Sequence, residues 1–80
     1  MNLEIITPEK RLFNGKVKLI RVPGTKGSFE VLHNHAPIIS TLEKGTIKIV
    51  PDNGENIFID VIGGIIEVQR NKIIVLADIV

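Results

Sequence analysis

Residues 65–80 read IIEVQRNKIIVLADIV, and this stretch decides the fold class. It is the one part of the chain that runs without Gly or Pro for long enough to form an ordinary helix. Its apolar positions, however, are filled almost entirely by Ile and Val, whose branched side chains suit a pleated strand better than a helix. The polar run Arg70-Asn71-Lys72 in its middle is typical of a turn. The stretch therefore predicts two strands, residues 65–69 and 73–78, rather than one helix.

The rest of the chain has the same character. Ile and Val make up 23 of the 80 residues, whereas Ala, the strongest helix former, occurs only twice. Gly and Pro divide the sequence into short runs, and turn chemistry is clearest at Pro23–Gly27 and at Asn53-Gly54. Strands every 8–12 residues are typical of antiparallel all-β folds. We therefore predict one domain over residues 1–80, an antiparallel β-sandwich or flattened barrel, with six further strands at residues 3–7, 16–22, 28–32, 38–42, 46–50 and 57–62.

Charge and composition argue against several classes of protein. Ten basic and nine acidic residues give a net charge of +1, which removes the usual electrostatic case for binding nucleic acid or a membrane surface. The chain has no Cys, as suits a reducing compartment. Its longest apolar run, residues 61–66, is far too short to span a membrane, and its start lacks the pattern of a secretory signal. We expect a soluble domain in the cytoplasm.

Several predicted strands are apolar on both faces. The runs at residues 38–39, 57–59, 61–62, 65–66 and 73–76 do not alternate between apolar and polar side chains. An antiparallel strand with one face in water should alternate, and so small a domain has little interior in which to bury both faces. Local burial at strand ends and sheet corners would explain part of this pattern. The more specific interpretation is that some of this surface meets another protein.

Motifs of catalysis and phosphate binding are missing from the sequence. Gly24-Thr25-Lys26-Gly27 is not the phosphate-binding loop of nucleotide-binding proteins, and its glycines fit a turn between strands. Neither serine lies in a nucleophile motif, and no base accompanies one. Three Phe residues without Trp or Tyr give a weak case for stacking nucleic-acid bases. We expect no catalytic residue, no cofactor and no small-molecule ligand.

His33-Asn34-His35 is the strongest metal-binding hint. In an extended segment, residues two apart point the same way, so both imidazoles could reach one ion. The sequence names no further ligands. The simpler interpretation is a loop in which His35 bonds to the backbone and His33 is exposed.

Four segments in order resemble the ε subunit of F-type ATP synthases. They are the opening at residues 3–15, the run from Val22 to Pro37 containing VPGTKGSF, the run from Ile62 to Val68 containing GGIIEV, and the ending IIVLAD at residues 73–78. The likeness spans residues 3–78. The chain departs from the family at Glu30, where Gly is common, at His33-Asn34, where Pro-Gly is common, and at Ile62, where Ser is common. It also stops at Val80, where relatives continue into a C-terminal helical hairpin, so we expect a short form that lacks this second domain.

The resemblance implies a ten-stranded β-sandwich at the foot of the central stalk, peripheral to the cytoplasmic face of a bacterial inner membrane. There it would clamp the γ subunit, rest on the polar loops of the c ring and couple proton-driven rotation to ATP synthesis without catalysing a reaction itself. By position in the family, Thr7, Lys26 and Ser28 would lie toward the c ring, and His35 and Thr41 toward γ. Where Ser28 stands the family often has an acidic residue. Two other interpretations stay open: a free-standing adaptor that self-associates, and a metal-binding module at His33 and His35.

Overall fold

A computed structural model describes residues 1–79, which form eight strands and no helix. The strands are β1 (Asn2–Ile6), β2 (Arg11–Gly24), β3 (Gly27–Leu32), β4 (Ile38–Leu42), β5 (Gly45–Pro51), β6 (Ile57–Val61), β7 (Gly63–Gln69) and β8 (Lys72–Asp78). All eight predicted strands are confirmed, and residues 65–78 form the hairpin of β7 and β8. Among these residues no helix could cross a membrane.

The start of β2 is the largest difference from the predicted strand bounds. The sequence places a break at Gly15, yet this residue lies inside β2, opposite Leu3 of β1. A Cβ atom on Gly15 would lie 3.3 Å from the ring of Phe13, so a glycine here leaves room for that ring. From the sequence alone, a glycine that leaves room for a neighbouring side chain inside a strand cannot be distinguished from a glycine that ends the strand.

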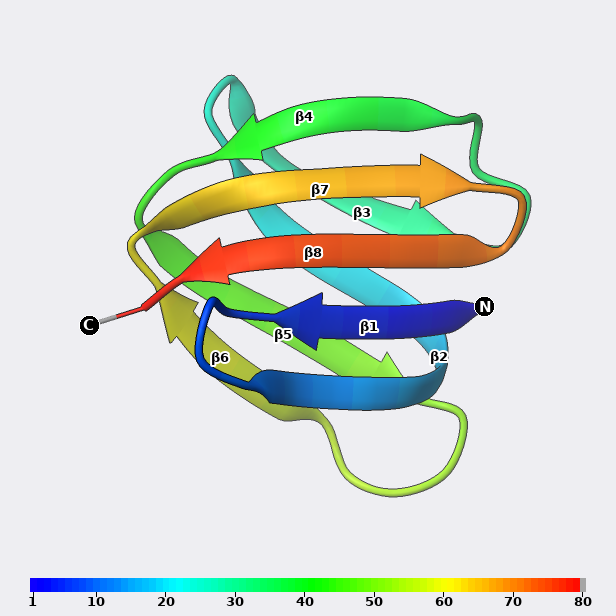
Figure 1. Cartoon of the computed structure of the whole chain (residues 1–80). Coiled ribbons are helices and arrows are strands. Elements are labelled where there is room, and N and C mark those ends of the chain that lie inside the picture. Colours follow the sequence, from blue (N-terminus) through cyan, green and yellow to red (C-terminus); the bar gives the residue numbers. More distant parts are fainter. Residues whose placement is uncertain (80) are drawn as a thin grey trace.

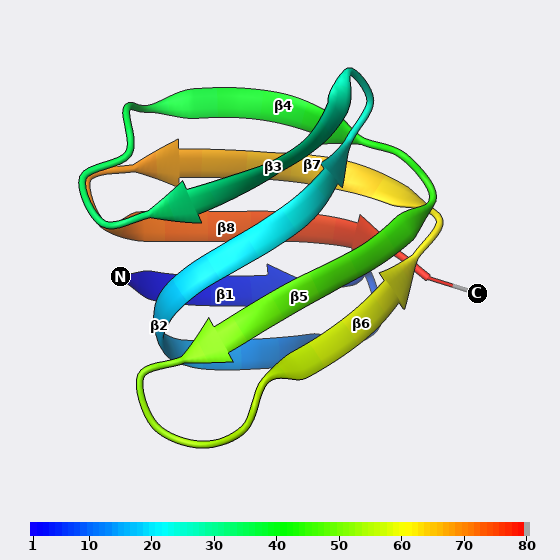
Figure 2. The same cartoon turned by 180° about the vertical axis from the view of Figure 1, so that it is seen from behind.

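The strands form two layers. Figure 1 shows β4, β7, β8, β1 and the first part of β2 in the nearer layer, and Figure 2 shows β3, the rest of β2, β5 and β6 from behind. β2 belongs to both layers, because its first half pairs with β1 and its second half pairs with β3 and β5. A single pairing of Gly24 with Leu42 joins β2 to β4. The fold is therefore the predicted sandwich, closed along one side like a flattened barrel.

Two details differ from the expected fold. The described chain forms eight strands rather than the ten implied by the resemblance. In addition, β1 and β8 run parallel, from Asn2 opposite Lys72 to Ile6 opposite Leu76, whereas the other pairs are antiparallel. This pairing joins the two ends of the chain, and no local turn signal in the sequence could reveal it.

The core lies between the layers and consists of side chains that alternate along the strands. Fifteen hydrophobic residues are buried, and none of the buried residues is polar or charged: Leu3, Ile5, Val17, Ile20, Val22, Val31, Leu42, Ile47, Ile49, Val61, Ile66, Val68, Ile73, Val75 and Ala77. The intervening residues of each strand point outward. We call the outer surface of β4, β7, β8 and β1 the β8 face, and the outer surface of β3, β5, β6 and the second half of β2 the β5 face.

Candidate functional site

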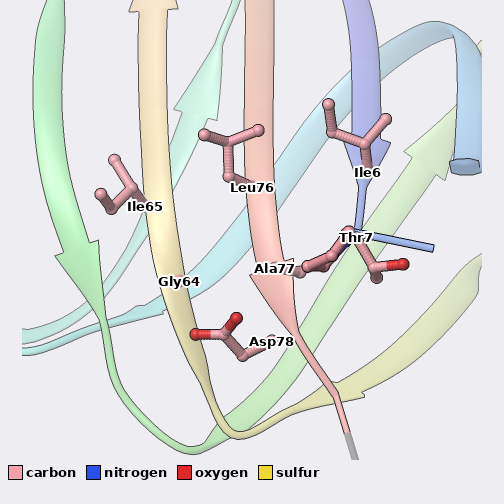
Figure 3. Close-up of a pocket in the computed structure, with 8 residues that line it drawn as sticks. Ile6, Thr7, Gly64, Ile65, Leu76, Ala77 and Asp78 are labelled. Atoms are coloured by element: carbon pink, nitrogen blue, oxygen red, sulfur yellow. The ribbon is translucent and has the colours of Figure 1, made fainter. Parts of the chain in front are cut away.

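A row of apolar side chains crosses the β8 face. The register places Ile65 of β7 opposite Leu76 of β8, and Leu76 opposite Ile6 of β1. Leu76 is 50% exposed and Ile65 is 44% exposed, although their neighbours Val75 and Ile66 are fully buried. Figure 3 shows the three side chains side by side. These residues form the apolar row, and they confirm that β7 and β8 carry apolar side chains on both faces.

A shallow groove follows the apolar row toward one end of the sandwich. It has a volume of about 420 Å³ and is lined by Ile6, Thr7, Pro8, Gly64, Ile65, Leu76, Ala77 and Asp78. Gly64 lies in β7, opposite Ala77 of β8, with a φ of +153°. A Cβ atom there would come within 2.4 Å of the Leu76 carbonyl oxygen. Any larger residue at this position would force the two strands apart. Gly64 thus shapes the groove.

Thr7 lies at the edge of this groove, just after β1. Its Oγ1 donates to the carbonyl oxygen of Lys10 at 3.1 Å and accepts from the Lys10 N–H at 3.1 Å. Those bonds hold the turn that leads into β2. The structure therefore places Thr7 beside the apolar row.

Lys26 and Ser28 lie in the β2–β3 hairpin, next to Thr41 at the end of β4. The hydroxyls of Thr25 and Thr41 are 2.9 Å apart, and the Thr25 N–H donates to the Thr41 carbonyl oxygen at 3.1 Å. Thr41 also pairs with Ile65, which places it at the other end of the apolar row from Thr7. Three strand spacings of about 4.8 Å separate the two threonines, roughly 14 Å in all. Four of the five predicted contact residues therefore cluster at one end of the sandwich.

His35 is the exception, because it precedes β4 at the opposite end of that strand. Its Nδ1 lies 2.7 Å from the carbonyl oxygen of Ala36, and its N–H donates to the Leu32 carbonyl oxygen. His33 is exposed. Asn34 between them has a φ of +66°, so the segment is not extended and the geometry assumed for a shared metal ion is missing. The simpler interpretation of the histidine pair is confirmed, and no cluster of metal-binding side chains occurs among residues 1–79.

The ionisable side chains are arranged differently on the two faces. On the strands of the β8 face, Glu4, Glu67 and Asp78 face outward together with Lys72. The first half of β2, in the same layer, adds the exposed cations Arg11 and Lys16. On the β5 face, Arg21 and Lys48 lie side by side in the register, next to Glu30 and Phe58. The β8 face therefore combines its apolar row with charges of both signs around it, whereas the centre of the β5 face is basic.

Residues 1–79 thus form a β-sandwich with an exposed apolar row and a shallow groove beside it. A family model described as ATP synthase, Delta/Epsilon chain, beta-sandwich domain matches residues 1–80. The chain belongs to this family. The resemblance seen in the four sequence segments is thereby confirmed.

Two solved structures contain chains of similar fold. One belongs to the mitochondrial ATP synthase of Euglena gracilis, described as OSCP/F1/c-ring in rotational state 1, with a TM-score of 0.84 at 16% identity. The other belongs to the mitochondrial ATP synthase of Tetrahymena thermophila, described as central stalk/cring, with a TM-score of 0.81 at 20% identity. These matches cover 94% and 98% of this chain but 48% and 63% of the other two, so the likeness is one of fold over part of those proteins.

The candidate interface contains residues that reasoning on polar motifs missed. Asp78 and Gly64 line the groove together with the apolar row, yet neither was among the predicted contact residues. The signal was present in the sequence, because residues 65–66 and 73–76 fail to alternate. What the sequence lacked was the register, which alone brings Ile65, Leu76 and Ile6 into one line.

Proposed function

We propose that this ATP synthase Delta/Epsilon-family chain is a non-catalytic subunit of the central stalk that clamps the γ subunit and contacts the c ring. In this role it couples proton-driven rotation of the ring to ATP synthesis carried out elsewhere in the complex. It would be a peripheral protein on the cytoplasmic face of a bacterial inner membrane. Family membership over the whole chain supports an ATP synthase subunit, and strands that share one core suit a rigid connecting element.

The apolar row on the β8 face is the observation that carries this proposal. Burying a large aliphatic side chain is worth about 1.5–3 kcal/mol relative to leaving it exposed, so three adjacent ones favour a covered state. The row is also rigid, since each member lies on a strand whose inner side chains are in the core. We assign this face to γ, with Thr41 at one end of the row. Thr7, at the other end, keeps its expected contact with the c ring, and His35 keeps its expected contact with γ.

The contact with the c ring is assigned to the corner formed by the β2–β3 hairpin. Lys26 and Ser28 are exposed there, and polar side chains suit the polar loops of a c ring. Hydrogen bonds between the hairpin and β4 connect this corner to the γ-binding face. One domain could thus transmit torque between the two partners through strands that share a core.

Sedimentation velocity of the 8.8 kDa chain, alone and mixed with γ from the same organism, tests the proposal. We expect a monomer that shifts completely into a one-to-one complex at micromolar concentration. A chain that ignores γ and forms a stable homodimer would support the adaptor interpretation instead. Adding a γ–c ring subassembly tests the c-ring contact, which Lys26→Glu should weaken while leaving the affinity for isolated γ unchanged.

A further inference from the structure

The groove beside the apolar row contains one ionisable side chain. Of its eight lining residues only Asp78 carries a charge, and Figure 3 shows its carboxylate beside Gly64 at the end of the groove. The position that a Cβ atom of Gly63 would occupy lies 3.9 Å from Oδ2 of Asp78. Glycines on β7 therefore leave open space next to the carboxylate, where a side chain from another molecule can approach.

The other two carboxylates of the β8 face already have side-chain partners. Glu4 forms an ion pair with Arg11 at 2.9 Å, the one ion pair within residues 1–79. Glu67 accepts a hydrogen bond from the Gln69 side chain at 3.4 Å. Asp78 makes no such contact in the described chain, and its main-chain carbonyl is used in a bond with the Ile62 N–H. Asp78 is therefore the one carboxylate of β1, β7 and β8 whose side chain has no hydrogen-bond or ion-pair partner within residues 1–79.

We propose that the groove binds a basic and aliphatic segment of its partner, with a Lys or Arg side chain pairing with Asp78. An aliphatic side chain of the same segment would lie against Ile6, Leu76 and Ile65. Charge complementarity supports this occupant, because an acidic or neutral polar segment would leave the carboxylate partly desolvated and unpaired. The proposal rests on the assignment of the β8 face to γ, and it adds the chemistry by which γ is recognised.

The ion pair would also give the interface a fixed register. An apolar row alone permits a partner to slide along it, since the hydrophobic effect is not directional. A charge pair at one end of the row defines one position, and like charge there would exclude wrong segments.

Affinity for purified γ, measured by calorimetry at several salt concentrations, tests the proposal on the intact chain. Asp78→Asn should weaken binding about tenfold or more and flatten the salt dependence, because one charge pair is lost. Asp78→Glu, which keeps the charge, should retain the salt dependence. Asp52→Asn changes an exposed carboxylate in the β5–β6 loop, far from the groove, and should change neither quantity.

The outcomes separate the two proposals. If the wild-type chain binds γ and Asp78→Asn binds with the same affinity and salt dependence, the ion pair is wrong while the assignment of function stands. If the wild-type chain does not bind γ, both proposals fail. Thermal unfolding followed by circular dichroism identifies a variant that has lost its fold. If Asp78→Asn does not fold, the salt dependence of wild-type binding tests the ion pair instead. An affinity for γ that does not change with salt concentration would overturn the ion pair.

Discussion

The two outer faces of this sandwich come from the same few residue types, yet they differ in how the register arranges them. On the β8 face, strand pairing aligns Ile65, Leu76 and Ile6 and leaves one carboxylate at the end of the row. On the β5 face, it places Arg21 and Lys48 next to each other, so that charge lies between Phe58 on one side and Glu30 on the other. The register also aligns Leu32, Leu19 and Val50 on the β5 face, so both faces carry an apolar row. The β8 face differs in that its row lies along a groove that contains the carboxylate of Asp78.

Exposed aromatic and aliphatic residues on both faces offer the strongest test of this comparison. Leu76→Asp puts a charge in the centre of the apolar row and should weaken γ binding at least about a hundredfold, as expected for a central interface residue. Phe58→Asp is the matched control on the β5 face, where the wild-type residue is 63% exposed against 50% for Leu76. It should leave the affinity within about threefold of wild type. Equal losses in the two variants, measured by calorimetry, would contradict the difference between the faces.

The glycine in the groove gives the next largest effect. Gly64→Ala should lower the free energy of unfolding by about 2–3 kcal/mol, because its Cβ would collide with the Leu76 carbonyl oxygen at a positive φ. Gly27→Ala is the control for backbone conformation alone, since its φ is also positive but nothing lies near its Cβ position. That change should cost about 1 kcal/mol.

Urea unfolding followed by far-UV circular dichroism measures both glycine variants, because the chain has no Trp or Tyr for fluorescence. Equal losses of unfolding free energy in the two variants would mean that the collision with the Leu76 carbonyl oxygen adds nothing to the cost of the positive φ. The β8 face would then owe its shape to something other than this contact.

A smaller effect is expected at the corner where the hairpin meets the β8 face. Thr25→Val and Thr41→Val each remove one partner of the hydroxyl pair, and the double variant should show a coupling energy of about 0.5 kcal/mol. Thr46→Val, whose hydroxyl bonds to Asp60 on the β5 face, should be additive with Thr25→Val. Additive behaviour of Thr25 and Thr41 in the same unfolding assay would show that this bond does not couple the hairpin to β4.

The surface ion pair gives the smallest effect. Glu4→Gln should cost about 0.5 kcal/mol or less, because the Arg11 side chain is 59% exposed and solvent screens the pair. The variant should bind γ as well as wild type does, in contrast to Asp78→Asn. A loss of affinity with Glu4→Gln would mean that γ binding depends on several charges of this face rather than on Asp78 alone.

The sequence predicted the strands well and the interface only in part. Strand positions depend on local features such as β-branched runs and turns, so each of the eight runs is found in the structure. The parallel pairing of β1 with β8 depends on contacts between the two ends of the chain, for which no local pattern exists. The same pairing completes the apolar row, which is why Ile6 was absent from the predicted contacts.

The predicted contact residues illustrate a second limit. Position in the family assigned Thr7 and Thr41 to different partners, whereas the structure places them at two ends of one row. His35 and Thr41 were assigned to the same partner, yet they lie at opposite ends of β4. Which partner each of these residues touches stays a prediction, because contacts with another chain are not encoded in the strand pattern of this one.

Cysteine labelling with and without γ tests the central claim most directly. The chain has no native Cys, so Leu76→Cys and Phe58→Cys each provide a single thiol, one on each face. At saturating γ, the rate of maleimide labelling at position 76 should fall at least about tenfold, and the rate at position 58 should not change. Protection of position 58, or equal labelling of both positions with and without γ, would contradict the assignment of the β8 face as the docking surface.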